Sequence, residues 1–401
     1  MKILSIETSC DETAVSLVEV TETKNSTEAR VLGNKLLSQV KLHEQYGGVY
    51  PNLAKREHAK NLGPLIFEVL KEAGEFRQAM NPLSPVDIIT LQKYLEREPE
   101  LFKELIQLVT AAEAPQIDAI AVTRGPGLEP ALWVGINAAR ALSHLWKVPV
   151  IPVNHMEGHI FSSILEKSEG SIFKIPTISL PGVALLISGG HTELVLLKEP
   201  GDYELIGSTR DDAVGEAFDK VARMLGLPYP GGPQISKYAE SARAAGVEPR
   251  VELPRPMLTS KDFDFSFSGL KTAVRYYLEK LPKITEEVRT DVALAFENVV
   301  GEVLLKKTIR AIEKHGAQTF IMGGGVSANR YLRTLFKEKL SEEFPDLALY
   351  IPDISLTTDN AVMIAIAGYY NRSRALENHE EETLRAEGNL KLHGLPSQET
   401  F

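Results

Sequence analysis

The chain has 401 residues, of which 43% are hydrophobic and 24% are charged, and its formal net charge is −10. A chain of this length is expected to form two or three domains or lobes, and the negative charge argues against a protein whose whole surface grips nucleic acid. No run approaches the roughly 20 apolar residues that span a bilayer. The single cysteine excludes an intrachain disulfide, and the acids in the first residues, MKILSIETSCDET, are atypical of a signal peptide. We therefore expect a cytoplasmic protein.

Residues 2–20 predict a β-hairpin. An apolar run (KILSIET) and a run of alternating polarity (TAVSLVEV) flank the polar turn SCDE. Residues 182–199 repeat this order, with GVALLIS and LVLLKE on either side of GGHTE. The repeat favours a duplicated architecture, although hairpins are common enough to recur by coincidence.

The remaining elements alternate between strands and helices. In the first half, strands are predicted over 117–123 and 148–153, with a helix over 128–146 between them. In the second half, a strand over 318–322 leads through three glycines into a helix, and a strand over 347–354 precedes a helix within 355–373. This alternation predicts an α/β protein with largely parallel sheets.

Two segments are expected to lie outside the sheets. Residues 75–116 contain MNPLSPVD and then an acidic amphipathic pattern over 91–109, which predicts an inserted helical element. The tail over 385–401 has no sustained periodicity, so we expect it to be flexible.

The segment VNHMEGHI (153–160) is a candidate metal site. His155 and His159 are four residues apart, so a helix places both imidazoles on one face. Asn154 is a suitable N-cap, and a helix N-terminus favours neutral imidazoles. The zinc-protease motif H-E-x-x-H needs its glutamate directly after the first histidine. Glu157 comes one residue later and points to another face, so the protease hypothesis fails on geometry. Without a third ligand, two surface histidines are an equal alternative.

Asp359 is the candidate third ligand. It lies in TTDNAV at the start of a late helix that follows a strand, a position that would face a cleft in an α/β fold. A His-His-Asp set with open positions suits zinc or iron(II). Considered alone, however, Asp359 is more simply explained as a helix cap.

Glycine-rich turns favour nucleotide binding. SGGHT (188–192) and GGGVSAN (323–329) place glycines at strand ends, where free backbone N–H groups can approach phosphate or ribose oxygens. Neither matches the P-loop or the dinucleotide fingerprint, and strand ends often need glycine for a tight turn alone. The further turn YPGGP (229–233) strengthens the nucleotide interpretation.

Three acids are further candidates. Asp219 follows Gly215 by four residues on a predicted helix and would reach ribose hydroxyls, although such a charged helix is by default a solvated face. Asp11 and Glu12 lie in the first hairpin turn, where acids are common because turns are polar. In a two-lobed nucleotide fold that turn faces the phosphates, which would suit both acids to a catalytic or metal-orienting role.

Nine segments, in this order, resemble the TsaD/Kae/Qri family of tRNA N6-adenosine threonylcarbamoyltransferases, bacterial type, formerly called O-sialoglycoprotein endopeptidases (Gcp). They are IETSCDETAVSLVEV, YGGVYPNLAKREH, AVTRGPGLEPALWVGINAARAL, VNHMEGH, LLISGGHTELV, DDAVGEAFDKVARMLGLPYPGGP, DFSFSGLKTAV, GGGVSANRYLR and TTDNAVMIA. The resemblance covers nearly the whole chain apart from the insertion and the tail. It implies a two-lobed actin/Hsp70/sugar-kinase-like (ASKHA) α/β fold with duplicated ribonuclease-H-like domains.

With that fold, we expect a first lobe over 1–155, carrying the insertion at about 75–116, and a second lobe over 156–358. Residues 359–384 are expected to form a helix that returns to the first lobe. Typical bacterial members lack the insertion, which would extend tRNA or partner contacts or be an inert surface excursion.

The resemblance also implies the reaction and its residues. The threonylcarbamoyl group of threonylcarbamoyl-AMP passes to N6 of adenosine 37 in tRNAs that read codons beginning with A, and AMP is released. His155, His159 and Asp359 match ligands of one divalent ion, Fe(2+) or Zn(2+). Asp11 and Glu12 match active-site acids, and Asp11 is the hypothetical base. The positions that match contacts to the nucleotide-bearing substrate are Leu186, Ile187, Ser188, Gly189, Gly190, Asp219, Gly232 and Asn329.

The implied partners are tRNA, a smaller paralogous subunit (TsaB type) and a P-loop ATPase (TsaE type), with no membrane. Local basic candidates for tRNA contact are Lys55, Arg56, Lys271 and Arg275, although most such residues are simply solvated. The chief alternative function is a metal-dependent endopeptidase; a sugar kinase or ATPase and a non-catalytic scaffold are others.

Overall fold

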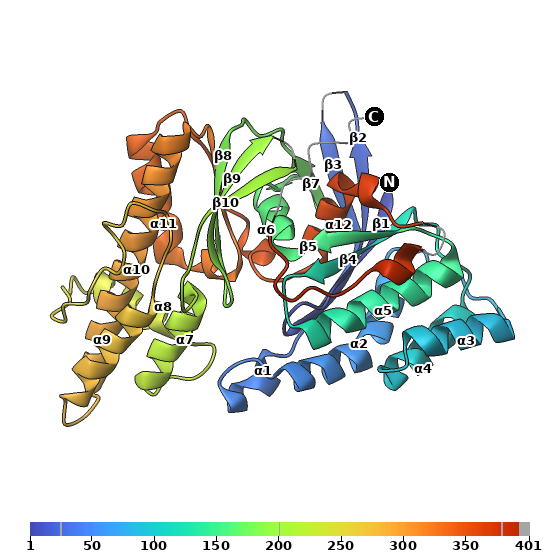
Figure 1. Cartoon of the computed structure of the whole chain (residues 1–401), viewed down its shortest axis with the longest axis horizontal. Coiled ribbons are helices and arrows are strands. Elements are labelled where there is room, and N and C mark those ends of the chain that lie inside the picture. The colour runs from blue at the N-terminus through green and yellow to red at the C-terminus, as the bar shows by residue number, and fades with distance from the viewer. Residues whose placement is uncertain (25, 200, 378–379, 393–401) are drawn as a thin grey trace. The chain divides into compact units, whose positions relative to one another are not determined.

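The computed structural model describes residues 1–24, 26–199, 201–377 and 380–392, and these form two compact units (Figure 1). The first unit comprises Met1–Pro176 and Asp359–Lys391, and the second comprises Thr177–Thr358 with Leu392. The division falls after Pro176 rather than after residue 155, where we expected it. Helix α6 (His155–Ser163) packs on α12 (Ala361–Tyr370), and strands β6 (Glu166–Lys167) and β7 (Ile172–Ile175) join the first sheet, so all three belong to the first unit.

The first unit contains a seven-stranded sheet in the order β5-β4-β1-β2-β3-β7-β6. Strands β1 (Lys2–Glu7) and β2 (Glu12–Glu22) form the predicted hairpin. Strand β1 also runs parallel to β4 (Ala119–Gly125), and β4 runs parallel to β5 (Val150–Asn154). Strand β3 (Thr27–Ser38) continues the sheet antiparallel to β2.

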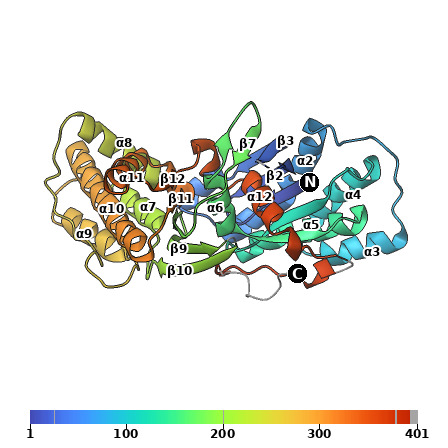
Figure 2. The same ribbon diagram turned by 90° about the horizontal axis from the view of Figure 1, so that it is seen from above.

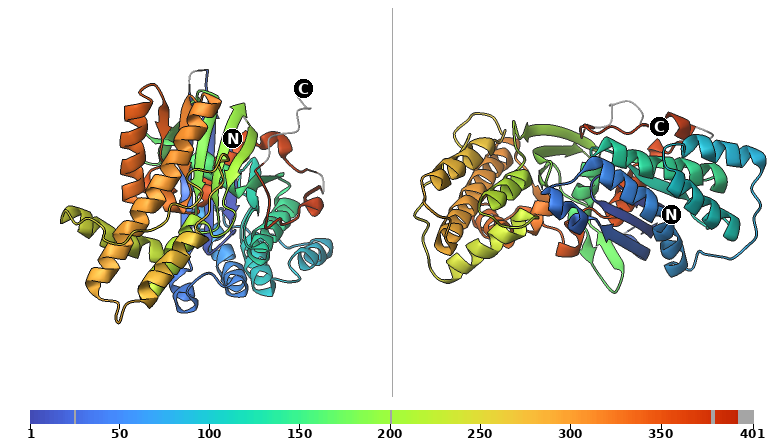
Figure 3. Two further views of the ribbon diagram at one scale, coloured as in Figure 1. Left: turned by 60° about the vertical axis from the view of Figure 1, so that its left-hand side comes forward. Right: turned by 90° about the horizontal axis from the view of Figure 1, so that it is seen from below.

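Helices cover both faces of this sheet. On one face, α2 (Pro51–Glu72) and α5 (Glu129–Trp146) lie side by side, and their apolar residues share a core with β1 and β2 (Figure 3). Helices α6 and α12 also lie side by side (Figure 2), and α12 packs on β1 and β2, where its first carbonyl, that of Ala361, accepts a hydrogen bond from Ser5 Oγ (2.7 Å). The short helices α1 (Val40–His43) and η1 (Glu44–Tyr46) precede α2.

The predicted insertion is helical, but it contains two helices, α3 (Pro85–Tyr94) and α4 (Pro99–Ala111), where the amphipathic pattern suggested one. The break precedes Pro99, because a residue before proline is disfavoured in the α-helical conformation. Leu101 and Leu105 of α4 are fully buried in the same core as α2, so the segment is part of the first unit's core.

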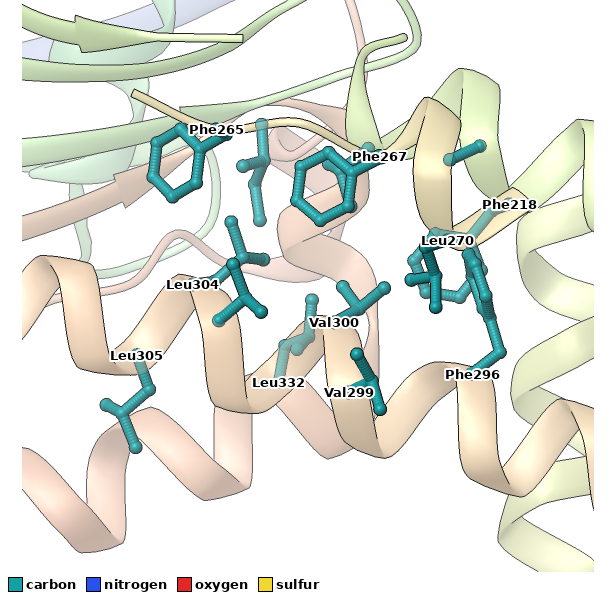
Figure 4. Close-up of a cluster of buried hydrophobic side chains, with 14 of the residues drawn as sticks. Phe218, Phe265, Phe267, Leu270, Phe296, Val299, Val300, Leu304, Leu305 and Leu332 are labelled. Carbon is teal, nitrogen blue, oxygen red and sulfur yellow. The ribbon is translucent and has the colours of Figure 1, made fainter. Parts of the chain in front are cut away.

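The second unit contains a five-stranded sheet in the order β10-β9-β8-β11-β12. Strands β8 (Gly182–Ile187) and β9 (Thr192–Glu199) form the second predicted hairpin, followed by β10 (Asp202–Ser208). Strand β11 (Thr319–Gly323) runs parallel to β8 and to β12 (Ala348–Tyr350). The helices are α7 (Val214–Met224), α8 (Gly231–Ala244), α9 (Ser268–Glu279), α10 (Glu286–His315) and α11 (Arg330–Glu343). Figure 4 shows a core of aromatic and aliphatic side chains from α7, α9, α10 and α11 and from the segment just before α9.

The two sheets share one topology. A hairpin and a third antiparallel strand (β1-β2-β3 or β8-β9-β10) are extended on the side of the first strand by two parallel strands (β4-β5 or β11-β12). This repeat confirms the duplicated architecture. The expectation of largely parallel sheets is wrong, because the hairpins that open each unit pair antiparallel and make both sheets mixed.

Part of the predicted flexible tail is ordered on the first unit. The Glu387 N–H donates to the Arg124 carbonyl (3.0 Å), and the Gly127 N–H donates to the Gly388 carbonyl (3.0 Å). These irregular backbone contacts leave no periodic pattern in the sequence. Residues 393–401 of the tail lie outside the described residues. Within the described ranges, the structure has no helix with the length and apolar character needed to cross a membrane.

Candidate functional site

The three predicted ligand residues meet in the first unit. Helix α6 starts at His155, and the Asn154 side-chain oxygen caps it by accepting from the Met156 N–H (2.9 Å). Because His155 and His159 are one turn apart, their ring centroids are only 4.7 Å from each other. Asp359 Oδ1 lies 3.3 Å from His155 Nε2 and 3.2 Å from His159 Nε2.

Asp359 does not cap its helix. The N-cap of α12 is Asn360, whose side-chain oxygen accepts from the Met363 N–H (3.0 Å). This leaves the Asp359 carboxylate directed at the two histidines. Helices α6 and α12 can approach each other closely because residue 158 of α6 is glycine: a Cβ there would lie 3.0 Å from Met363 Cγ on α12.

This cluster fits a metal ion. One ligand atom from each of His155, His159 and Asp359 can be chosen so that all lie within 4.8 Å of one another. His159 is fully buried, and within the described part of the chain neither ring nitrogen makes an aligned hydrogen bond, although Nε2 is close to Asp359. A buried imidazole without a good hydrogen bond is costly, and coordination to a cation would remove that cost. Two imidazoles and a carboxylate therefore could hold a metal ion here.

Glu7 is a functional candidate that we did not predict. Its Oε2 lies 3.1 Å from His155 Nδ1 and accepts from Thr123 Oγ1 (2.5 Å), and its Oε1 accepts from the Ser9 N–H (2.5 Å). The pairing with Nδ1 turns His155 Nε2 toward Asp359, as outer carboxylates do for metal-bound histidines. An acid at the end of the mostly apolar run KILSIE, directly before the polar turn, was the available signal.

The charge on His155 differs from the sequence expectation of a neutral ring. Burial opposes a charge on His155, but Asp359 and Glu7 together raise the pKa of His155 well above its usual value. Burial also opposes ionisation of Asp359 and Glu7, yet His155 lowers the pKa of both carboxyls. Two carboxylates thus outweigh the helix N-terminus, and metal binding would displace the proton that they hold on the ring.

Asp11 and Glu12 form an acidic pair at the first turn. Asp11 is buried, and its Oδ2 has no hydrogen-bond partner among the described residues. Glu12 opens β2 and accepts from Ser38 Oγ (3.3 Å). Burial raises the pKa of Asp11, and burial together with the charges of Asp359 and Asp11 raises the pKa of Glu12 well above its usual value. The turn is therefore suited to hold and move a proton.

Glu157 faces away from the cluster, as its position in the sequence indicated. It is buried, and its Oε2 accepts from Asn371 Nδ2 (2.7 Å). The glutamate that a zinc protease would use to activate water is therefore engaged elsewhere.

The second unit has a pocket of about 600 Å³, a volume typical of small-molecule sites. Four of the eight predicted substrate contacts line it: Gly189, Asp219, Gly232 and Asn329. The others do not. Leu186 and Ile187 are fully buried in β8, Ser188 Oγ accepts from the His191 N–H (3.1 Å), and Gly190 is exposed outside the pocket lining.

Hydrogen bonds fix the polar residues of this pocket. Asp219 Oδ1 accepts from the Gly231 N–H (2.7 Å), which holds the YPGGP turn against α7. Asn329 caps α11 through the Leu332 N–H (2.9 Å) and donates to Glu297 Oε1 (2.7 Å). Glu297 is fully buried and was not predicted, although an acid within the apolar run VALAFENVV of α10 was a usable signal.

The four basic candidates for RNA contact are each paired with an acid. The ion pairs are Lys55–Glu98 (3.0 Å), Arg56–Glu57 (3.7 Å), Lys271–Asp212 (2.8 Å) and Arg275–Glu279 (3.3 Å). Their charges are thus partly compensated within the chain.

A family model described as TsaD, tRNA N6-adenosine threonylcarbamoyltransferase, matches residues 30–79 and 89–366. The chain belongs to the TsaD family. The unmatched residues 80–88 lie within the predicted insertion. The tRNA N6-adenosine threonylcarbamoyltransferase of Thermosipho africanus is 39% identical over 392 residues, covering 98% of this chain and all of that protein. The protein of the same description from Persephonella marina is 42% identical over 372 residues, covering 92% and 90%.

TsaD membership confirms the predicted enzyme class, a transferase of the threonylcarbamoyl group to N6 of a tRNA adenosine. Among solved structures, full-length HypF in its phosphate- and nucleotide-bound form is similar with a TM-score of 0.51 at 12% identity, covering 94% of this chain and 47% of that chain. At this identity the likeness shows the fold alone, and it agrees with the predicted ASKHA-like arrangement of two α/β sheets.

Proposed function

We propose that this TsaD protein takes its acyl group from threonylcarbamoyl-AMP and transfers it to N6 of adenosine 37 in tRNAs that read codons beginning with A, releasing AMP. The observation that carries the proposal is the His155–His159–Asp359 cluster, in which both histidines are buried and the half-buried Asp359 carboxylate lies within electrostatic reach of the buried acid Asp11. Iron(II) and zinc suit this donor set. Such an ion would stabilise the negative charge that develops on oxygen during acyl transfer.

Asp11 is proposed as the proton acceptor. The N6 amine attacks the carbonyl carbon, the bond from that carbon to the phosphate oxygen breaks, and AMP leaves with the electron pair. The proton that N6 loses passes to Asp11 Oδ2, which has no hydrogen-bond partner among the described residues. The raised pKa of Asp11 makes the carboxylate a better base than an exposed aspartate. Asp11→Ala with normal metal content and a normal transfer rate would contradict this role.

The pocket of the second unit is proposed to bind the AMP part of the donor. Gly189 and Gly232 leave room for phosphate and ribose beside backbone N–H groups, and Asp219 and Asn329 offer polar atoms at the wall. We further propose that the protein acts in the cytoplasm, with a smaller paralogous subunit and a P-loop ATPase. The compensated basic side chains support a shared tRNA-binding surface.

The test is transfer by the purified protein with its partner subunits, given threonylcarbamoyl-AMP and unmodified tRNA. The intact protein is expected to form the modified adenosine. His155→Ala is expected to lose bound metal and, with it, about 100-fold or more in rate, because one of the three ligands is removed and the cation would stabilise the transition state by several kcal/mol. Glu157→Gln keeps a partner for Asn371 and is the matched control, with a rate near that of the wild type. Absence of the modified adenosine with the intact protein would overturn the proposal.

A further inference from the structure

Two tyrosines form an exposed stacked pair in the first unit. The rings of Tyr46 and Tyr50 have centroids 5.5 Å apart and planes 22° from parallel, and the residues are 56% and 50% exposed. Gly47 between them has φ 64°, a left-handed conformation that ends η1 and turns the chain toward α2. Aromatic side chains of this size are usually covered, so a stacked pair left open to solvent is suited to receive another flat ring.

Hydrogen bonds through two buried side chains connect the backbone of Tyr50 to the acidic turn. The Tyr50 N–H donates to His43 Nδ1 (3.2 Å), and His43 Nε2 pairs with Gln39 Oε1 (3.2 Å). The Gln39 N–H then donates to the Asp11 carbonyl (2.9 Å). His43 and Gln39 are both buried, so the backbone of Tyr50 is held by a packed support, and that support also contacts the residue that we propose as the proton acceptor.

We propose that Tyr46 and Tyr50 are the stacking surface for the acceptor adenine of the RNA. This inference rests on the proposed function. A base in a single-stranded loop is recognised by stacking on aromatic side chains, with its edges left free for other contacts. Stacking on this pair holds the adenine by its face and leaves its N6 edge open to the acidic turn. The pair thus positions the acceptor, and the metal cluster is not part of it.

Tyr46→Ala and Tyr50→Ala are expected to raise the KM for an anticodon stem-loop RNA about 5- to 150-fold, the range of one base–aromatic stack. The KM for threonylcarbamoyl-AMP stays unchanged. Tyr→Phe at either position retains the ring and is expected to restore the KM. Leu42→Ala is the control, because Leu42 is an exposed neighbour on the same segment (43%) that cannot stack as a ring does. Thermal melting of each variant checks that the fold is kept.

A fluorescent base locates the contact. An RNA with 2-aminopurine at the acceptor position is expected to be quenched on binding to the wild type and to the Phe variants, and not to the Ala variants. Equal KM values in all variants, or quenching that survives both Ala substitutions, would overturn the inference. If the Tyr→Ala and Leu42→Ala variants all lose binding to a partner subunit, this segment is a protein-docking surface, and that result would also overturn the inference. If the wild type forms no modified adenosine, the proposed function itself fails.

Discussion

Glu7 shows how one buried side chain sets the chemistry of another. It has no exposed surface and binds one metal-ligand candidate, His155, together with Ser9, two residues along the chain, and Thr123 on β4. A carboxylate in such a site is retained only if each oxygen is satisfied. Glu7 therefore acts through His155, whose orientation it holds.

Glu7→Gln is expected to weaken metal affinity about 10- to 100-fold, as changes to outer partners of metal ligands do. The amide keeps the size of the side chain but loses the negative charge that faces His155 Nδ1. Competition with a chelator of known affinity measures the effect. Unchanged metal affinity would show that Glu7 has only a structural role at the end of β1.

His58 provides a pH dependence of stability. Burial, which outweighs its hydrogen bond to the Cys10 carbonyl, lowers the pKa of His58 to about 4. The folded protein thus keeps the ring neutral, while the unfolded chain takes up a proton near pH 6.5. Above that pH, the ring is neutral in both states, and the stability of the folded protein does not depend on His58 protonation. As the pH falls from about 6.5 to about 4, the free energy of unfolding is expected to drop by up to about 3 kcal/mol.

Urea denaturation of the metal-free protein at pH 7, 5.5 and 4.5 checks this. His58→Gln retains hydrogen-bonding groups near Thr13 and Cys10 but does not titrate, so its loss of stability across the series is expected to be smaller. The same decline in both proteins would assign the effect to other groups.

Among the elements, α12 is one that packs too closely for a larger side chain at one position. Its residues from Ala361 to Tyr369 are all buried, because the helix packs against the sheet as well as against α6. Gly368 allows this approach: a Cβ there would lie 2.7 Å from Ala121 Cβ on β4. The helix carries Asp359 at its start, so its position also sets that of the carboxylate.

Gly368→Ala is therefore expected to destabilise the first unit by about 1–3 kcal/mol, the cost of overpacking a filled core. Gly269→Ala in α9 is the matched control, because nothing lies within 4 Å of its Cβ position, and it is expected to stabilise by at most about 1 kcal/mol. Hydrogen exchange measured on peptides of the first unit for Gly368→Ala, and on peptides of the second unit for Gly269→Ala, gives the change in stability of each unit. A neutral Gly368→Ala would show that α12 moves without cost.

At the scale of the whole molecule, each unit has its own sheet and core, and the two candidate sites divide between them. The metal cluster lies wholly in the first unit, and the 600 Å³ pocket lies wholly in the second. Units with separate cores need not unfold together, so one melting temperature does not describe both.

A chelator is expected to lower the protection of backbone amides against hydrogen exchange in the first unit. AMP is expected to raise this protection in the second unit. A ligand at 100 times its dissociation constant adds about 2.7 kcal/mol to the state that binds it. Hydrogen exchange measured peptide by peptide separates the two effects. Chelator effects confined to the second unit would contradict the assignment of the metal site.

Features that depend on neighbouring stretches of the chain follow from the amino-acid sequence alone. Both hairpins, the alternation that makes the protein α/β, and the placement of His155 and His159 on one helical face result from periodicity and spacing. The order of the motifs also identifies the family. The position of Glu157 is enough to exclude a zinc protease, because helical geometry fixes the direction of each residue on α6.

Contacts between distant segments depend on the tertiary structure. Glu7 and His155 are 148 residues apart, and nothing in their local sequences specifies that they pair. The same holds for Asp359. Its local sequence predicts a helix cap, whereas the fold places it beside the two histidines as a ligand candidate. Packing and backbone hydrogen bonds likewise decide the mixed sheets, the division after Pro176 and the ordered residues before 392. An apolar pattern in the sequence does not determine these contacts, because it does not specify which distant segments pair.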